Sequence, residues 1–410
     1  MHILFLTDNF PPEVNAPATR TYEHAIRWIA EGCKVTVITC VPNFPEGKIF
    51  SGYKNKWHQY ELIDGINVVR VKTYITANNG FLLRTFDYLS FMITGFIAGL
   101  FQPKPDVIVA TSPQFFTACM GWMLSVCRKR PFVFELRDLW PASIIAVGAM
   151  KKSFLITWLE KLELLLYKKA DAIVSVTNSF KDELVSRGIE NNKIFVVLNG
   201  VDHSNYQSTF IKDPKLSEKF DLENKFVVGY LGTHGMAHSL NIILDAAEKL
   251  QKYSNILFML VGSGATKNDL VMNAKKRNLR NIIFVNSQPK NLIPRYYSLF
   301  DISLIHLKNT PLFSRVIPSK LFESMAMGLP IIMALPEGEA TKIVSDYKCG
   351  VIIPPEDDIE LVKNLLALQS NKEQLYKYKE SGLRASLLFT RDAKAREMLG
   401  ILEKVVKNYL

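Results

Sequence analysis

Residues 226–264 read FVVGYLGTHGMAHSLNIILDAAEKLQKYSNILFMLVGSG and decide the fold class. Two short apolar runs, Phe226–Leu231 and Ile256–Val261, flank an amphipathic stretch, and each run leads into glycines. A strand, a crossover helix and a second strand in this order are typical of a parallel sheet. The stretch therefore predicts a doubly wound α/β domain.

The same alternation continues in both directions. We expect further strands at residues 3–7, 34–39, 68–72, 106–110, 132–135, 172–176, 194–198, 282–285, 302–306 and 331–333. Residues 199–223 interrupt the pattern because they are polar and turn-rich, as linkers between domains are. A chain of 410 residues also exceeds what one core usually covers. We therefore predict two domains, residues 1–202 and 203–389, with a C-terminal helix at 390–410 that packs back on the first.

Composition narrows the class of protein further. Apolar residues make up 48% of the chain, which excludes disorder, and the net charge of +11 favours anionic partners. The five cysteines have no C-x-x-C spacing, so neither a disulfide framework nor a zinc site is expected. The chain starts without a secretion signal, and its longest uncharged apolar stretch, residues 88–101, is shorter than the roughly 20 residues that span a membrane. We expect a cytosolic protein that does not cross a membrane and does not bind nucleic acid.

Glycines follow both strands of the opening stretch. Because ligands of doubly wound sheets bind outside the carboxyl ends of the strands, we expect the chemistry in a cleft between the two domains. The backbone N–H groups of Gly232, Thr233 and His234, and those around Gly262, can bind a phosphate there. Each run is also compatible with a plain turn, and neither fits the full dinucleotide fingerprint or a Walker loop.

Residues 315–330, RVIPSKLFESMAMGLP, are the most informative segment. Ser319 follows a proline and marks the start of a helix, so Lys320 lies in the first turn, where the helix dipole disfavours a cation by about 0.3–1 kcal/mol. A bound phosphate would offset this, with Arg315 assisting. Glu323, about one turn on, can accept hydrogen bonds from a ribose diol. The alternative is a solvated lysine and glutamate on an exposed helix face.

This segment, together with Asn199-Gly200-Val201-Asp202, resembles the retaining GT-B glycosyltransferases of family 4, over essentially the whole chain. The resemblance implies two Rossmann-like domains facing a cleft, a nucleotide-sugar donor bound by the second, and no metal or other cofactor; consistently, the chain has no D-x-D. It implies that Glu323 holds the ribose.

Two departures from the family pattern concern the donor's diphosphate. Arg315 stands where the family has the first glutamate of its E-x7-E motif, and His234 and His238 stand where it has a basic pair. The leaving diphosphate is therefore expected to rely more on Lys320, Arg315 and backbone amides.

Three segments resemble a subgroup of the family that assembles bacterial surface polysaccharides, especially L-fucosamine transferases of O-antigen synthesis. They are Phe10-Pro11-Pro12-Glu13 followed by Arg20, Arg137-Asp138-Leu139-Trp140-Pro141, and Pro318-Ser319-Lys320. The resemblance suggests an N-acetyl-L-fucosamine donor and places Ser319 in the donor site.

Arg137 and Asp138 directly follow the expected strand at 132–135. Asp138 can take the proton of an acceptor hydroxyl or hold a hydroxyl, and Arg137 can bind a phosphate or orient that carboxylate. A salt link between the two that anchors the loop is the alternative. In the loop 9–20, which we expect to close over a diphosphate, Arg20 lies either in the cleft as a substrate contact or on the helix surface.

Two apolar helical stretches bear on membrane binding. Residues 81–101 carry phenylalanines at a strict spacing of five, which spreads them around a helix that is either buried or partly in lipid. Residues 151–169 place a leucine-rich face between paired lysines, which favours packing in the protein over docking on an anionic bilayer.

We therefore expect a retaining glycosyltransferase that moves an N-acetylated 6-deoxyhexosamine from UDP to an undecaprenyl-diphosphate-linked saccharide. It would work at the cytoplasmic face of the inner membrane, with Lys320, Arg137 and Asp138 as catalytic residues. A nucleotide-sugar epimerase, which would convert a UDP-sugar unaided, and a non-catalytic UDP-sugar-binding scaffold are the alternatives.

Overall fold

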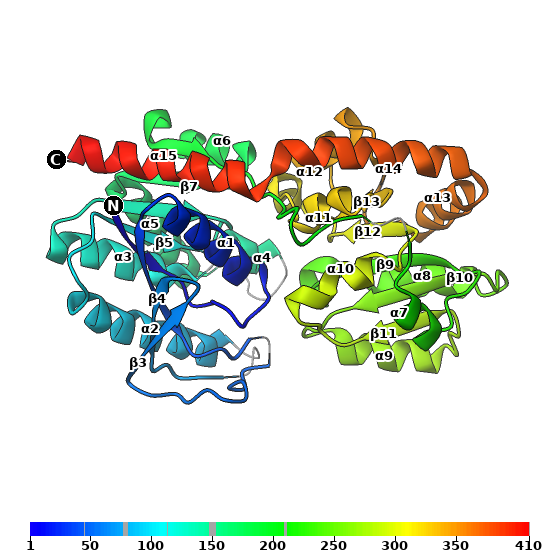
Figure 1. Ribbon diagram of the computed structural model, residues 1–410, viewed down its shortest axis with the longest axis horizontal. Helices are drawn as coiled ribbons and strands as arrows, with labels where there is room; N and C mark the ends of the chain where they lie inside the picture. Colours follow the sequence, from blue (N-terminus) through cyan, green and yellow to red (C-terminus); the bar gives the residue numbers. More distant parts are fainter. Residues whose placement is uncertain (45, 77–80, 113, 147–152, 209–210, 410) are drawn as a thin grey trace. The chain divides into compact units, whose positions relative to one another are not determined.

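The structure is a computed structural model that describes residues 1–44, 46–76, 81–112, 114–146, 153–208 and 211–409. The chain forms two compact units (Figure 1): unit 1 is Met1–Leu198 with Arg391–Leu410, and unit 2 is Asn199–Thr390. The unit boundary falls between Leu198 and Asn199, at the start of the expected linker 199–223, and the rest of that stretch belongs to unit 2 and includes a helix, α7 (Pro214–Lys219). Asp213 starts this helix by accepting a hydrogen bond from the amide of Leu216 (3.0 Å), a local cap that outweighs the polar composition.

Unit 1 is built on a sheet whose strand order is β3-β4-β2-β1-β5-β6-β7-β8. Its strands are β1 (His2–Leu6), β2 (Lys34–Cys40), β3 (His58–Ile63), β4 (Ile66–Val71), β5 (Val107–Thr111), β6 (Phe132–Leu136), β7 (Ala172–Ser175) and β8 (Ile194–Val196). Neighbouring strands pair in parallel except β3 and β4, which form an antiparallel hairpin. The sequence did not predict β3, because an edge strand with one exposed face lacks a continuous apolar run.

Helices cover the sheet of unit 1 and close its core. They are α1 (Ala16–Ala30), α2 (Phe81–Leu100), α3 (Phe115–Arg128), α4 (Ala142–Ala146), α5 (Phe154–Lys169), α6 (Asn178–Ser186), the short η1 (Asn191–Lys193) and α15 (Arg391–Tyr409). The C-terminal α15 packs along α1, and the indole nitrogen of Trp28 donates a 2.9 Å hydrogen bond to the carbonyl of Ala395. Met398 and Leu402 of α15 are buried in the same core as the central strands, so the last helix completes unit 1.

Unit 2 is built on a parallel sheet with the strand order β11-β10-β9-β12-β13-β14. Its strands are β9 (Phe226–Leu231), β10 (Ile256–Val261), β11 (Ile282–Val285), β12 (Ile302–His306), β13 (Ile331–Ala334) and β14 (Gly350–Ile353). Its other helices are η2 (Met236–His238), α8 (Asn241–Lys249), α9 (Lys267–Lys276), η3 (Lys290–Leu292), α10 (Ile293–Tyr297), η4 (Pro311–Arg315), α11 (Lys320–Ala326), α12 (Glu339–Asp346), α13 (Asp358–Ser370), α14 (Lys372–Ser386) and η5 (Leu387–Phe389). The two doubly wound α/β units confirm the predicted fold class.

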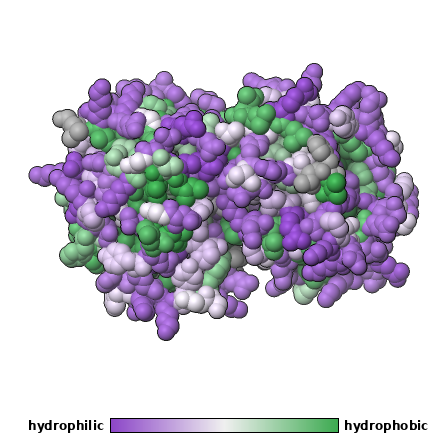
Figure 2. All heavy atoms as spheres, viewed as in Figure 1, coloured by the Kyte–Doolittle hydropathy of each residue, from purple (hydrophilic) through white to green (hydrophobic). Residues whose placement is uncertain are grey.

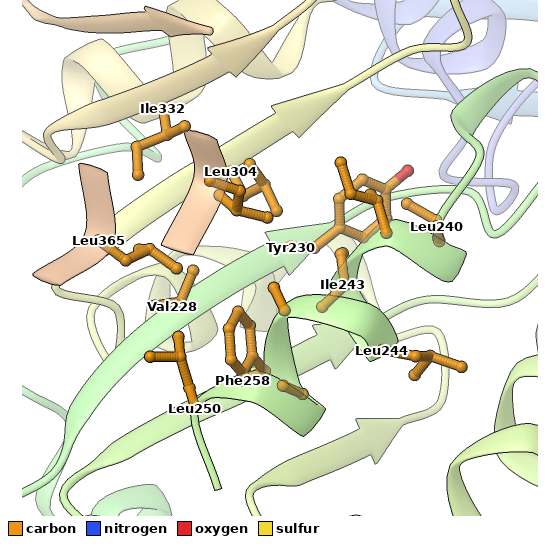
Figure 3. Close-up of a cluster of buried hydrophobic side chains, with 14 of the residues drawn as sticks. Val228, Tyr230, Leu240, Ile243, Leu244, Leu250, Phe258, Leu304, Ile332 and Leu365 are labelled. Atoms are coloured by element: carbon orange, nitrogen blue, oxygen red, sulfur yellow. The ribbon is translucent and has the colours of Figure 1, made fainter. Parts of the chain in front are cut away.

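The core of unit 2 extends to Tyr230, near the carboxyl end of β9. Figure 3 shows Val228, Phe258 and Leu304 among the side chains packed between strands and helices, with the ring of Tyr230 at the edge of the cluster. Gly229 precedes this tyrosine in β9, and a Cβ there would lie 2.1 Å from the Phe300 ring. This glycine therefore serves packing rather than ligand binding.

Helix α2 has one buried face and one exposed apolar face. The buried alternative for 81–101 holds for the first face, and lipid contact of the second stays a prediction. Gly95 and Gly99 let it approach α3, where added Cβ atoms would lie 2.5 Å from Met120 and 2.6 Å from Leu124. The opposite face exposes large apolar side chains, namely Leu83, Phe86, Ile93 and Ile97, with Phe101 just beyond the helix. We call these five residues the α2 stripe. Figure 2 shows hydrophobic patches on the viewed face of unit 1 among hydrophilic neighbours.

Helix α5 packs in the protein, as its sequence favoured. Ile156, Leu159 and Leu166 are buried, whereas Phe154 and Trp158 are exposed. Residues 151–152, at the start of the expected helix, lie outside the described residues.

Candidate active site

Lys320 begins α11, beside the glycine loops of unit 2. Its Nζ is buried without a hydrogen-bond partner and lies 4.0 Å from the centre of the Tyr230 ring. Burial lowers the pKa of Lys320 to about 7, with Glu323 opposing the shift. The exposed-lysine alternative is therefore wrong. Burial removes the water around this ammonium group, and the Tyr230 ring replaces only part of the lost interaction. An anion bound next to Nζ would supply the rest.

Ser319 and Arg315 precede this lysine on the same segment. Ser319 is the N-cap of α11, but its side chain makes no capping hydrogen bond. Arg315 ends η4 and is half-buried. A Cβ on Gly338 would lie 1.8 Å from the carbonyl oxygen of Ser314. The start of α12 therefore packs closely against η4 and holds the backbone next to Arg315 in place.

A hydrogen bond from a buried tyrosine orients the carboxylate of Glu323. The Tyr297 hydroxyl donates a 2.9 Å hydrogen bond to Glu323 Oε2, and burial raises the pKa of Tyr297 well above its usual range. The carboxylate is half-buried, so the reading of Glu323 as an exposed helix-face residue is also wrong. A fixed carboxylate near Lys320 is suited to accept hydrogen bonds from vicinal hydroxyls.

Three of the glycine-loop amides are already used in backbone hydrogen bonds. The amide of Gly232 donates to Val261 O (2.9 Å), that of His234 to Ser263 O (2.9 Å) and that of Gly262 to Val285 O (3.0 Å). These bonds extend the pairing of the parallel strands past their ends, so those N–H groups are already used. The expectation that the amides of Gly232, His234 and Gly262 bind the diphosphate is therefore wrong, and that for the Thr233 amide stays a prediction.

The loop after β9 is instead held in place by a side-chain hydrogen bond and packs against Lys320. The Tyr230 hydroxyl donates a 2.8 Å hydrogen bond to the carbonyl of Thr233, which fixes the turn. Gly232 has φ +144°, and a Cβ there would lie 2.8 Å from Lys320 Nζ. Gly232 thus leaves room for the ammonium group of Lys320.

The histidines beside this loop are neutral. Burial lowers the pKa of His234 to about 4 and that of His238 to about 3. His306 Nε2 accepts the amide of Glu356 (2.9 Å), so its Nδ1 carries the proton and donates to His238 O (2.6 Å). His234 and His238 therefore supply no fixed charge in the free protein.

In unit 1, Arg137 and Asp138 follow β6 at the carboxyl edge of the sheet. Ser112 Oγ, after β5, accepts hydrogen bonds from the amides of Arg137 (2.7 Å) and Asp138 (3.2 Å). Burial raises the pKa of Asp138 to about 6, against hydrogen bonds from Ser143 and the amide of Leu139. A carboxylate with that pKa can accept a proton from a hydroxyl near neutral pH.

Arg137 does not pair with Asp138, so the salt-link alternative is wrong. Its Nη1 is buried without a hydrogen-bond partner, and the charge that stabilises it is that of Glu135. Burial lowers the pKa of Arg137 to about 9. The guanidinium has a buried donor left over, which fits the phosphate-binding reading.

Arg20 is not a substrate contact, and it is not on the helix surface. Its side chain is 1% exposed and its Nε donates to Glu135 Oε1 at 2.7 Å. Its Nη1 and Nη2 donate to the carbonyls of Leu198 and Val197, each at 3.1 Å. Arg20 is therefore a buried structural cation that holds the end of the segment leaving unit 1.

The loop 9–20 is anchored by a buried acid to the segment that follows β2. Glu13 accepts hydrogen bonds from the amides of Asn43 and Phe44, both at 2.8 Å, and burial raises its pKa to about 7. Asn15 caps α1 by accepting a hydrogen bond from Ala18 N (3.0 Å). Closure of this loop over a diphosphate stays a prediction.

Sequence reasoning missed an acidic pair at the same edge of unit 1. Asp8 follows β1, and Asp87 of α2 is close enough for the two charges to interact. Burial raises the pKa of Asp87 to about 7, and the negative charge of Asp8 adds to this shift. Arg84 is close to both acids and donates a 2.6 Å hydrogen bond to the Tyr88 hydroxyl. The signal was present, because Asp8 directly follows the first strand, at the edge where such sheets bind ligands.

A cavity of about 730 Å³ opens beside α2 in unit 1. Its walls are apolar and basic, and they include Ile49, Trp57, Tyr74, Lys48 and Lys72, with Ser90 and Thr94 of α2. Trp57 is 70% exposed, with Lys72 Nζ 5.1 Å from its ring centre. The sequence did not indicate this cavity because β3 and β4 bring its walls together.

Neither a membrane-spanning helix nor a metal-binding cluster is found among the described residues. Within the described ranges, the helices are all too short or too polar to pass through a bilayer. The same part of the chain holds no group of three or more histidine, cysteine or acidic side chains placed for metal binding.

The fold agrees with comparisons to known proteins. Residues 17–205 match the family described as Glycosyltransferase Family 4, and residues 212–384 match Glycosyl transferases group 1. The chain is thus a GT-B glycosyltransferase, with a family 4 region followed by a group 1 region.

Individual relatives support the same class. The chain is 25% identical over 339 residues to the colanic acid biosynthesis glycosyl transferase WcaI of Escherichia coli (strain K12), covering 80% of this chain and 82% of that protein. Sucrose-phosphate synthase from Thermosynechococcus elongatus has a TM-score of 0.80 at 14% identity, over 99% of both chains. Anabaena HepE in complex with UDP-glucose has a TM-score of 0.73 at 16% identity, over 98% of this chain and 100% of that one.

Proposed function

We propose that this glycosyltransferase moves a sugar from a UDP-sugar, with retention of configuration, to an undecaprenyl-diphosphate-linked saccharide in surface polysaccharide assembly. The observation that carries the proposal is the buried, unpartnered Nζ of Lys320 at the start of α11. The similarity to WcaI, named for colanic acid biosynthesis, supports the pathway. The solved complex of HepE with UDP-glucose supports a UDP-linked donor. The sugar we propose is N-acetyl-L-fucosamine or a related 6-deoxyhexosamine.

In this proposal the donor binds to unit 2. Glu323 accepts hydrogen bonds from the ribose hydroxyls, and Lys320 with Arg315 meets the diphosphate. Negative charge grows on UDP as the bond from the sugar C1 to the β-phosphate oxygen breaks, so cations held in place stabilise the transition state more than the bound donor. These side chains supply the positive charge, and the proposal therefore needs no metal or other cofactor.

The acceptor binds to unit 1. Asp138 accepts the hydrogen bond of the reacting hydroxyl, and Arg137 binds a phosphate of the lipid diphosphate. The acceptor oxygen bonds to C1 on the face that UDP leaves, and the hydroxyl proton passes to the departing diphosphate. One glycosidic bond forms as the sugar–phosphate bond breaks, and the configuration at C1 is kept.

The surface of unit 1 supports work at a membrane. The α2 stripe exposes Phe86 at 61%, Ile93 at 55% and Ile97 at 49%, and the neighbouring cavity adds Trp57 with two lysines. Apolar side chains flanked by cations bind anionic bilayers. We propose peripheral binding at the cytoplasmic face of the inner membrane, where a lipid-linked acceptor is presented.

The test measures UDP release from a panel of UDP-sugars, with and without undecaprenyl-diphosphate-linked saccharides. We expect release only with the acceptor, and a product whose anomeric configuration, read by NMR, matches that of the donor. Conversion of the donor without acceptor would instead identify an epimerase. UDP-sugar binding without acceptor-dependent release would identify a scaffold.

A further inference from the structure

His234 is buried without any partner for its ring. The residue is 0% exposed, and neither Nδ1 nor Nε2 has a hydrogen-bond partner. A neutral imidazole carries one donor and one acceptor, and leaving both unmet in the interior is unfavourable. Lys320 Nζ beside it is also unmet. Two basic side chains that lack partners at one place indicate that an anionic group completes the site.

The groups around His234 come from several elements. Tyr230 of β9 has its ring centre 5.8 Å away, and Lys267 of α9 and Lys320 of α11 act on the ring by their charge. Lys267 Nζ is already used, since it donates to Gly262 O (2.7 Å), Val285 O (3.0 Å) and Asn286 Oδ1 (2.7 Å).

The remaining titratable neighbours lie behind these groups. His238 of η2 interacts electrostatically with His234 and Lys320. Nδ1 of His306, in β12, donates a hydrogen bond to the backbone carbonyl of His238. Glu356 is close to His306 and is held by the Ser239 hydroxyl, and Glu323 lies next to Lys320. Among these neighbours of His234 in the described structure, Lys320 is the only cation whose charged group has no hydrogen-bond partner.

Glycines form the wall against the ring. A Cβ on Gly262 would lie 3.3 Å from His234 Nε2 and 1.9 Å from Gly232 O. Gly262 and Gly232 both have positive φ, +150° and +144°, which side chains rarely adopt. Glycine at these two positions lets the backbone pack directly against the His234 ring and the ammonium group of Lys320.

We propose that His234 is a proton-accepting contact for the donor's diphosphate: it is neutral in the free protein and becomes an imidazolium that donates a hydrogen bond to a phosphate oxygen. Lys320 turns from the Tyr230 ring to the same diphosphate as the ligand enters. The proton comes from solvent, and no covalent bond changes. The inference rests on the proposed function, because the ligand is the diphosphate of the nucleotide donor.

Binding of the diphosphate is then coupled to proton uptake. In the free protein, burial and the charges of Lys267 and Lys320 hold the pKa of His234 at about 4. A bound polyanion raises it, so affinity increases as the pH falls. Each proton taken up weakens binding about tenfold per unit rise in pH. Lys320, with a pKa of about 7, contributes mainly above pH 7, so measurements at pH 6 isolate the histidine.

The main test observes the imidazole directly. ¹³C–¹H NMR spectra of the histidine rings are recorded at pH 6 with and without UDP, and His234→Gln assigns the resonance among the seven histidines. We expect a neutral ring in the free protein and an imidazolium in the UDP complex. A His234 ring that stays neutral in the complex overturns the inference.

Calorimetry gives an independent reading of the same event. UDP-glucose, whose diphosphate has no group that titrates near pH 6, is titrated at pH 6 in two buffers of different ionisation enthalpy, which counts the protons taken up on binding. We expect close to one proton for the unmodified protein and for His203→Gln, whose ring bonds to Ser386 O, and a clear loss for His234→Gln. Equal uptake in His234→Gln would sink the inference.

The outcomes separate the two proposals. UDP that binds while His234 stays neutral overturns the proton coupling alone and leaves the glycosyltransferase proposal standing. If neither UDP, GDP, ADP nor pyrophosphate binds, both the diphosphate site and the proton coupling are wrong.

Discussion

The hydroxyl of Tyr297 donates its hydrogen bond to Oε2 of Glu323 across 2.9 Å, from a ring that is buried in unit 2. The core therefore fixes the direction of the carboxylate that we assign to the donor's ribose. Tyr297→Phe keeps the packing but removes this bond. We expect the KM for UDP-sugar to rise about fivefold to tenfold, as for a bond worth about 1 kcal/mol, with a smaller effect on kcat. Tyr296→Phe, at the adjacent buried ring, is the control, and equal KM values in both variants would contradict the assignment.

Lys320 is expected to act mainly in the transition state. Lys320→Ala removes the cation that stabilises the leaving diphosphate, so kcat should fall about 10²- to 10³-fold. Steady-state UDP release measures this, with Lys342→Ala on the exposed side of α12 as the matched control. Near-normal turnover in Lys320→Ala would remove this lysine from the mechanism.

Asp138 predicts a pH dependence of acceptor use. Its pKa of about 6 lies above the ordinary value, so the carboxylate is ionised above pH 6 and is neutralised below it. We expect kcat/KM for the acceptor to fall about tenfold per pH unit below pH 6 and to level off above it. Asp138→Asn should lower activity and abolish the fall of kcat/KM below pH 6. Asp182→Asn, at an exposed position on α6, should leave this pH dependence unchanged. An unaltered acid limb in Asp138→Asn would assign the titration to another group.

Arg20 is expected to act on stability rather than on substrate. Arg20→Leu leaves Glu135 buried without its cation, which destabilises unit 1 by about 3–5 kcal/mol. Thermal unfolding followed by tryptophan fluorescence reports this through Trp28, which is buried in the same unit. Replacing both partners with Leu should recover part of the loss.

UDP binding by the folded Arg20→Leu protein should be unchanged, because the contacts of Arg20 lie in unit 1. Arg396→Leu, at a side chain that is 70% exposed, is the control for stability. A change in UDP affinity at full stability would restore Arg20 as a substrate contact.

The α2 stripe is expected to control membrane binding. Replacing Phe86, Ile93 and Ile97 together with Ser should reduce sedimentation with anionic lipid vesicles at least tenfold, because each exposed apolar side chain contributes on the order of 1 kcal/mol or more when buried in lipid. Met272→Ser, an exposed apolar position on α9, serves as the control. Vesicle binding that persists in the triple variant would place the membrane surface elsewhere.

Much of the fold follows from local sequence. The central strands of both units are short apolar runs, and those predicted at 226–231, 256–261, 282–285 and 302–306 match the observed strands end to end. Strands β3 and β14 were missed because edge strands with exposed faces carry a weaker pattern. The place of Lys320 in the first turn of a helix was also predicted from the proline and serine before it.

Other features depended on contacts between residues far apart in the chain. Arg20 meets Glu135 and the carbonyl of Leu198 only after α1 has packed on the sheet, so its own neighbours gave no sign of burial. The amides of Gly232 and Gly262 are used because adjacent strands end in register, which no short motif records. The residue order alone determined the alternation of strands and helices, since that depends on spacing along the chain. Only the tertiary structure decided which polar groups found partners and which, like Lys320 and His234, were left without one, because hydrogen bonding depends on what the fold brings within about 3 Å.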